Sequence, residues 1–61
     1  MSIQKIRQRM GLRQEDLAQK INVDRTTVTK WETGIASPRA SMLLQLADLL
    51  NCTVDDLLRK D

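Results

Sequence analysis

Most of the side chains that could do chemistry in this chain lie in residues 14–38, QEDLAQKINVDRTTVTKWETGIASP. This segment contains two short amphipathic stretches separated by Asn22-Val23, a spacing typical of two helices joined by a tight turn. The second stretch is dense in hydrogen-bond donors and acceptors, supplied by four polar residues: Arg25, Thr26, Thr29 and Lys30. Such a pair lets one helix lie across a nucleic-acid backbone while the other enters the major groove.

Catalytic chemistry is disfavoured by what the chain lacks. There is no histidine and only one cysteine, Cys52, so an internal disulfide cannot form and a zinc site is implausible. Asp55 and Asp56 are adjacent at an expected helix start, and their diverging side chains cannot form a paired acid/base site. No glycine-rich phosphate loop or activated nucleophile is present. We therefore expect no enzymatic activity, no metal or other cofactor, and no evident small-molecule ligand.

Length and charge indicate one small domain, residues 1–61, with a polarised surface. A domain of this size buries only about 60% of its unfolded surface, so a compact helical core is expected. Residues 1–31 hold seven Lys and Arg against three Asp and Glu, a charge of +4, whereas residues 32–61 hold three against five, a charge of −2. A basic half is expected if one face meets phosphates. Uneven charge is also common in small helical proteins without such a partner.

No targeting or membrane segment is visible in the sequence. The longest apolar run, Met42-Leu43-Leu44, is far shorter than the roughly 20 residues needed to span a bilayer. We therefore expect a cytoplasmic protein with no membrane partner.

Five short helices are predicted, and their signals are local. The first starts after Ser2 as N-cap and stops at Gly11. The second runs from about Gln14 to Ile21, followed by Asn22, which tolerates the left-handed conformation of a sharp helix exit. The fourth is expected to start with Ser37 as N-cap and Pro38 as its first residue. Its predicted buried face is Ala40, Leu43, Leu44, Ala47 and Leu50. The fifth opens with a capping box at Thr53-Val54-Asp55-Asp56 and buries Val54, Leu57 and Leu58.

The third segment, residues 24–32, has conflicting signals. The β-branched run Thr26-Thr27-Val28-Thr29 favours a strand by propensity. Helix is favoured because Asp24 can cap the N–H of Thr26 or Thr27, because Val28 and Trp31 then share one face, and because Gly34 closes the segment. The prediction is therefore a helix with an uncovered polar stripe.

These motifs resemble the phage repressor/Cro family of helix-turn-helix DNA-binding domains, also called XRE-type, over almost the whole chain. The resemblance is carried by Gly11-Leu12, Gln14-Glu15-Asp16-Leu17-Ala18, Val28, Trp31-Glu32 and Gly34, and by the leucines that follow Pro38. It implies an all-α, five-helix, lambda-repressor-like fold with the helix-turn-helix at about residues 14–33. The chain departs from the family at Arg13, where a capping Ser or Thr is usual, at Asn22, where glycine is usual, and at Ile35-Ala36, where many relatives carry lysines.

The resemblance also implies roles for individual side chains toward double-stranded DNA. Base reading would fall to Arg25, Thr26, Thr29 and Lys30, since arginine commonly pairs with guanine O6 and N7 and the threonine methyl can meet thymine. Phosphate contact and positioning would fall to Arg13, Gln14, Thr33 and Arg39. Gln14 could hold a phosphate or hydrogen-bond Arg25. Arg7 and Glu32 resemble a structural ion pair of the family, and Trp31 is expected in the core.

The expected function is a sequence-specific transcription regulator, a repressor that binds a palindromic operator as a homodimer. Met42 and Leu49 on the last helices are the expected dimer contact. The alternative is a protein-interaction adaptor or antitoxin-type partner that uses the same fold. A pure adaptor should ignore DNA at low salt, whereas a repressor should bind DNA with steep salt dependence.

Overall fold

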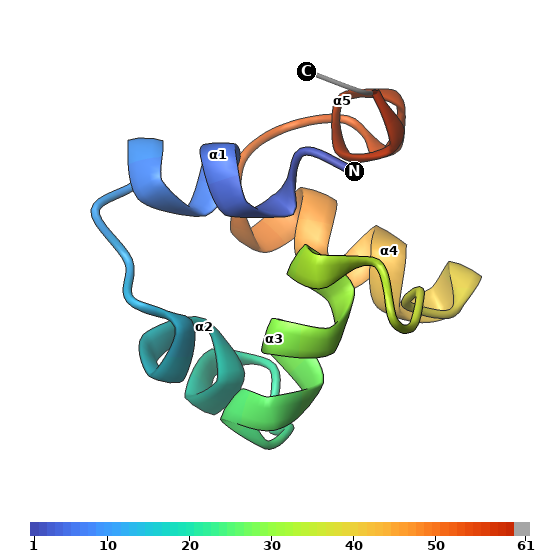
Figure 1. Ribbon diagram of the computed structural model, residues 1–61. Coiled ribbons are helices and arrows are strands. Elements are labelled where there is room, and N and C mark those ends of the chain that lie inside the picture. The colour runs from blue at the N-terminus through green and yellow to red at the C-terminus, as the bar shows by residue number, and fades with distance from the viewer. Residues whose placement is uncertain (60–61) are drawn as a thin grey trace.

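The computed structural model describes residues 1–59, so the last two residues of the predicted domain lie outside the described part. Within it the chain forms five helices and no strand, which confirms the predicted all-α fold class (Figure 1). The helices are α1 (Ile3–Arg9), α2 (Gln14–Lys20), α3 (Arg25–Thr33), α4 (Ala40–Leu49) and α5 (Val54–Leu58). None of them is long and apolar enough to cross a bilayer.

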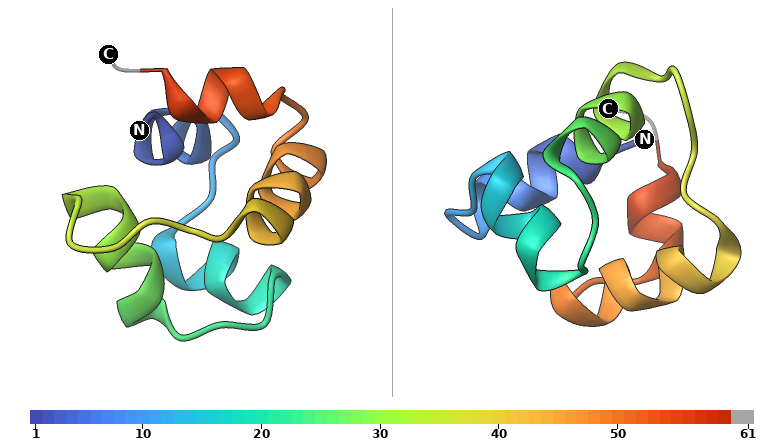
Figure 2. Two further views of the ribbon diagram at one scale, coloured as in Figure 1. Left: turned by 90° about the vertical axis from the view of Figure 1, so that its right-hand side faces the viewer. Right: turned by 90° about the horizontal axis from the view of Figure 1, so that it is seen from below.

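The helices surround one core that positions α3 at a corner of the molecule. The α2–α3 pair lies at one end, and α1 and α5 lie at the other, beside the N-terminus (Figures 1 and 2). Every helix contributes apolar side chains to the core, which consists of Ile3, Ile6, Leu17, Ala18, Ile21, Val28, Trp31, Leu46, Ala47, Leu50 and Leu57. The buried residues of α3 are Val28 and Trp31, which lie on one face of the helix. The opposite face is therefore exposed.

The α2–α3 turn forms as its residue types predict. Asn22 adopts a left-handed backbone conformation with φ of 60°, which asparagine tolerates better than most residues. Gly34 ends α3 with φ of 82°. Residues 25–33 are helical, so tertiary packing of Val28 and Trp31 outweighs the strand propensity of the threonine run. The helix prediction for this segment is confirmed.

Ser2 and Asp24 occupy the predicted N-cap positions of α1 and α3, but neither side chain makes the predicted cap hydrogen bond. The hydroxyl of Ser2 instead donates to the carbonyl of Arg59, and its backbone N–H donates to Leu57 O at 2.9 Å. The carbonyl of Asp24 accepts the N–H of Thr27 at 3.0 Å. In contrast, the capping box of α5 forms, with Thr53 Oγ1 accepting from Asp56 N at 3.0 Å.

The start of α4 and part of its buried face also differ from the prediction. The helix begins at Ala40 with Arg39 as N-cap, not at Pro38. Pro38 is buried and lines the same pocket as Trp31 and Met42, and residues 36–39 lie outside the helix.

Leu43, Ala47 and Leu50 of the predicted α4 face pack in or against the core, whereas the other two predicted residues do not. Ala40 is exposed and Leu44 is 64% exposed, whereas Leu46 is fully buried. On α5, Leu58 is likewise 50% exposed rather than buried. A leucine-rich helix offers several stripes at helical spacing, and only contact with the other helices selects one of them.

Candidate nucleic-acid interface

The uncovered face of α3 carries the polar row that was predicted to read bases. Arg25, Thr26 and Lys30 are exposed, and Thr29 is half-buried against α2. Because Arg25 and Thr29 are four residues apart on a helix, they are neighbours on one strip, and Thr26 and Lys30 form a second strip beside it. The row presents donors from Arg25 and Lys30 and hydroxyls from the threonines, which are the groups that hydrogen-bond to base edges and phosphates.

A shallow groove of about 250 Å³ lies between the start of α2 and the start of α3. It is lined by Arg7, Arg13, Gln14, Glu15 and Arg25, so three of the predicted contact residues converge there. Its charged lining suits an anion or a polar edge rather than an apolar ligand.

A hydrogen-bond network fixes Gln14 in this groove. Gln14 Nε2 donates to Glu32 Oε1 at 2.9 Å, and Gln14 Oε1 accepts from Thr29 Oγ1 at 3.0 Å. These are the partners that the structure gives Gln14, and Arg25, one of its two predicted alternatives beside a phosphate, is not among them. No local pattern predicts this choice, because the partners lie 15 and 18 positions away in the sequence.

The network ends in an ion pair between α1 and α3. Arg7 Nε donates to Glu32 Oε2 at 2.7 Å, and Arg7 Nη2 donates to Glu32 Oε1 at 3.2 Å. Arg7 Nη1 also donates to the carbonyl of Leu12 at 2.7 Å. The side chains of Arg7 and Glu32 are only 8% and 3% exposed. A bidentate pair of this kind positions the helices relative to one another.

Arg13 contacts two acidic neighbours on its own helix. Its guanidinium lies 3.1 Å from Asp16 Oδ2 and 3.2 Å from Glu15 Oε1, and its side chain is 75% exposed. The side-chain hydrogen bond from Arg13 is the main cause that lowers the pKa of Asp16. Asp16 Oδ2 also accepts the backbone N–H of Arg13 at 2.9 Å, so the side chain of Asp16 caps the start of α2. The three-residue spacing between Arg13 and Asp16 is that of a capping box, and it is visible in the sequence.

The remaining predicted positioning residues lie at the far end of α3 and beyond it. Thr33 Oγ1 donates to the Thr29 carbonyl at 2.9 Å, so its proton is used within α3. Arg39 is exposed at the start of α4. Between them Ile35 is 75% exposed.

The two residues expected at a dimer contact lie outside this face. Met42 and Leu49 are partly buried against the core of their own chain. The large apolar residues that α4 and α5 expose are instead Leu44 and Leu58.

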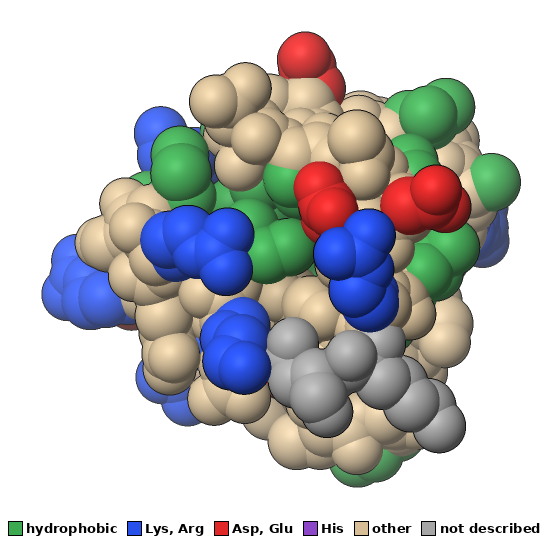
Figure 3. Space-filling model, turned by 90° about the horizontal axis from the view of Figure 1, so that it is seen from above, with side chains coloured by type: hydrophobic (Ala, Val, Ile, Leu, Met, Phe, Trp, Pro, Cys, Tyr) green, Lys and Arg blue, Asp and Glu red, His purple; other side chains and the backbone are tan. Residues whose placement is uncertain are grey.

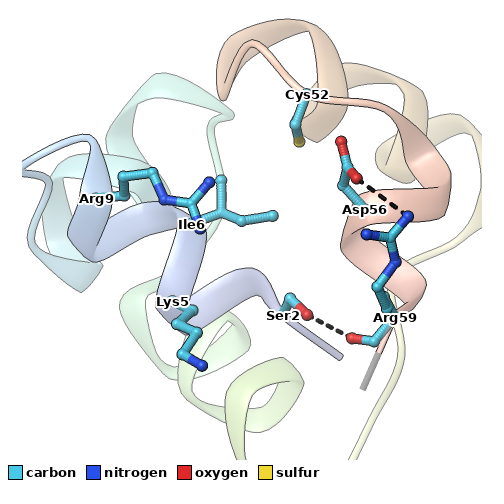
Figure 4. Close-up of a pocket in the computed structure, with 7 residues that line it drawn as sticks. All are labelled: Ser2, Lys5, Ile6, Arg9, Cys52, Asp56 and Arg59. Atoms are coloured by element: carbon cyan, nitrogen blue, oxygen red, sulfur yellow. Dashed lines mark hydrogen bonds and ion pairs between the residues drawn. The ribbon is translucent and has the colours of Figure 1, made fainter. Parts of the chain in front are cut away.

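A second pocket, of about 180 Å³, lies between α1 and α5, at the end of the molecule away from the α2–α3 turn (Figures 1 and 4). Figure 3 shows this end from above, with Lys and Arg side chains around an apolar patch and acidic side chains beside it. In Figure 4, Cys52 and Ile6 form its apolar part, and Arg9 and the Asp56–Arg59 pair border it. Burial raises the pKa of the Cys52 thiol, with a further contribution from Asp56, which keeps it a neutral packing residue at pH 7.

Comparison with known proteins agrees with this arrangement. A family model described as helix-turn-helix matches residues 3–57. The chain belongs to this family. It is a family of DNA-binding transcription regulators, and the predicted XRE-type resemblance is confirmed.

Three similar proteins are named as regulators. The HTH-type transcriptional activator BcrR of Enterococcus faecalis is 36% identical over 56 residues, covering 92% of this chain and 28% of BcrR. The HTH-type transcriptional regulator ImmR of Bacillus subtilis (strain 168) is 32% identical over 59 residues, covering 97% of this chain and 46% of ImmR. An uncharacterized HTH-type transcriptional regulator of Archaeoglobus fulgidus is 33% identical over 55 residues, covering 90% of this chain and 79% of that protein. This chain thus spans less than half of BcrR and of ImmR. No solved structure matched.

Proposed function

We propose that this helix-turn-helix chain is a sequence-specific regulator that binds double-stranded promoter DNA in the cytoplasm. The observation that carries the proposal is the uncovered polar row of α3 beside the groove that holds Gln14. In this proposal α3 enters the major groove, where Arg25, Thr26, Thr29 and Lys30 contact base edges. Arg13, Gln14, Thr33 and Arg39 contact the flanking phosphates and set the register of the protein on the duplex.

We further propose that the chain acts as a homodimer on a palindromic operator. Two copies of α3 would then lie about 34 Å apart, one turn of the duplex. The contact is formed by α4 and α5, with the exposed Leu44 and Leu58 at its centre and the partly buried Met42 and Leu49 at its edge. Such a contact would cover the apolar side chains that these helices leave in water. Sedimentation should give a dimer at high micromolar concentration, and Leu44→Glu should give a monomer.

Regulation by occupation of promoter DNA would make the protein a repressor. The similar protein BcrR is named an activator, so the sign depends on where the operator lies relative to the promoter. A reporter carrying the selected operator over the promoter should lose expression when the protein is supplied. The same operator placed upstream of the promoter tests activation.

Selection of bound duplexes from a random pool is the deciding experiment. We expect enrichment of a palindromic motif with half-sites one helical turn apart, and an affinity that falls steeply with salt concentration. Arg59→Ala is a matched control for charge removal, because Arg59 lies at the end of α5, away from α3 (Figures 1 and 4); it should leave the motif unchanged. Failure to enrich any motif at low salt would contradict the proposal.

A protein-docking role is the second candidate function. It is favoured by the exposure of Ile35, Leu44 and Leu58, which a partner protein could cover. Under this alternative the polar row of α3 stays in water, and substitutions in that row leave the activity unchanged.

A further inference from the structure

The hydrogen bonds that join α1, α2 and α3 form one continuous network, in which the donor and the acceptor of each bond are fixed. Glu32 accepts from Arg7 at 2.7 and 3.2 Å and from Gln14 Nε2 at 2.9 Å. Gln14 Oε1 then accepts from Thr29 Oγ1 at 3.0 Å. The network therefore begins at a buried ion pair and ends at the hydroxyl of Thr29, in the polar row of α3.

The chemistry of the two end groups determines the orientation of every member. Arginine has only donors, and an ionised carboxylate has only acceptors. Gln14 must therefore offer its NH₂ group to Glu32, which leaves its carbonyl oxygen facing Thr29. Since a carbonyl oxygen only accepts, the hydroxyl of Thr29 must be the donor of that bond.

The other polar neighbour of Thr29 also accepts. Thr29 Oγ1 lies 3.2 Å from the carbonyl oxygen of Arg25, one turn earlier in α3. The single proton of the hydroxyl is thus used inside the protein in either geometry. What Thr29 can present outward is a pair of acceptor sites on Oγ1.

We propose that Thr29 reads the major groove only as a hydrogen-bond acceptor, and so selects an amino base, adenine or cytosine, over a keto base. This inference rests on the proposed function. In the major groove adenine N6 and cytosine N4 are donors, whereas guanine O6 and thymine O4 are acceptors. Opposite Thr29, a keto oxygen would face another acceptor with no proton between them, which leaves both groups unsatisfied.

The neighbouring side chain has the opposite preference. Arg25 carries donors only and lies one turn before Thr29 on the same strip of α3. It therefore selects acceptors such as guanine O6 and N7. A half-site should then show a keto base opposite Arg25 and an amino base at the position opposite Thr29. Arg7 and Glu32 act as positioning residues, because they touch no base and fix the orientation of Gln14.

The first experiment compares motifs selected by the wild-type chain, by Thr29→Val and by Thr29→Ser. Valine matches the shape of threonine but has no hydroxyl, whereas serine keeps the hydroxyl. The position that loses its preference in Thr29→Val alone is the position that Thr29 reads. We expect adenine or cytosine there for the wild type and for Thr29→Ser.

The second experiment removes the amino group from the DNA. The base at that position is replaced by its analogue without the amino group, which is purine for adenine or pyrimidin-2-one for cytosine. Wild-type affinity should fall about 3- to 10-fold, the equivalent of one net hydrogen bond. The affinity of Thr29→Val should not change, because the partner of the amino group is already gone.

A third variant tests the positioning role of Glu32. In Glu32→Gln the new amide can donate to Gln14, so the amide of Gln14 can turn and offer its NH₂ group to Thr29. The hydroxyl of Thr29 then loses its acceptor on Gln14 and keeps only the longer bond to the carbonyl of Arg25 at 3.2 Å. Its proton can turn from that bond to a keto base, so the preference for an amino base should weaken. A merely structural role would lower affinity for every sequence equally and keep the ranking.

The outcomes separate this inference from the proposed function. Enrichment of guanine or thymine at the position that Thr29→Val changes would overturn it, as would a motif that Thr29→Val leaves unchanged at every position. Preference for thymine would indicate contact with the methyl group of Thr29 instead. If the wild-type chain selects no motif at all, the proposed function fails before this inference is reached.

Discussion

Arg7 and Glu32 form a bidentate ion pair across 25 positions of sequence, with Nε and Oε2 2.7 Å apart and both side chains more than nine-tenths buried. The pair joins α1 to α3 and also holds Gln14 through Glu32 Oε1. The stability of the folded chain and the orientation of Gln14 beside the polar row therefore depend on the same two residues.

Removal of one partner of this pair should destabilise the chain strongly. Glu32→Leu leaves the guanidinium of Arg7 buried without a counter-charge, which costs about 3–5 kcal/mol in free energy of unfolding. The double variant Arg7→Met/Glu32→Leu removes both charges and should recover most of that loss. Urea denaturation followed by circular dichroism measures both. A double variant no more stable than Glu32→Leu would show that packing, and not charge, dominates at this site.

Substitution of two leucines on α4 should change the free energy of unfolding by very different amounts. Leu46 is fully buried and Leu44 is 64% exposed. Leu46→Ala should cost about 2–5 kcal/mol because it leaves a cavity in the core. Leu44→Ala should change the free energy of unfolding of the monomer by no more than about 0.5 kcal/mol. Thermal unfolding at low protein concentration compares the two. Equal losses would mean that the phase of α4 differs from the one described.

Stability should fall in acid, and Asp56 should contribute to that fall. The pKa of Asp56 is lowered, first by the hydrogen bond from the backbone N–H of Thr53 and then by the Thr53 side chain. Because its folded pKa is below the unfolded value of about 3.9, its contribution is present above that value and is lost as pH falls through the folded pKa. Urea midpoints between neutral pH and acid should therefore converge for the wild type and Asp56→Asn. Parallel curves would contradict the assignment.

The acidic neighbours of Arg13 should weaken DNA binding. Glu15 and Asp16 hold its guanidinium, so a phosphate must compete with them. Glu15→Gln should raise the affinity for all sequences about equally, by about two- to fivefold at low salt, the equivalent of an exposed ion pair. Arg13→Ala should lower the salt slope by about one unit. Asp48→Asn on α4 is the matched control for loss of an acid. If Asp48→Asn raises affinity as much as Glu15→Gln, the effect is one of net charge alone.

Loss of Arg25 should change specificity and not only affinity. Arg25→Ala should relax base preference at one position in each half-site, at a cost of about 1–3 kcal/mol for the preferred base. Competition binding with a set of single-base operator variants measures this. An unchanged ranking of those variants would show that Arg25 does not read a base.

Local signals predicted the elements that position the interface. The helix over residues 25–33, the left-handed Asn22 and the Thr53–Asp56 capping box all follow from residues within a few positions of one another. Residue type and the spacing between nearby residues determine the local backbone conformation, so these features can be predicted from the sequence. The family resemblance rests on the same spacing.

Tertiary structure alone decided which partner each side chain meets. The hydroxyl of Ser2 bonds a carbonyl 57 positions away, and α4 begins at Ala40, after the buried Pro38. The amide of Gln14 is oriented by Glu32. The burial of Leu46 instead of Leu44 was also decided by tertiary structure. A sequence pattern permits several faces and several partners, and only the packing of distant helices around one core selects among them.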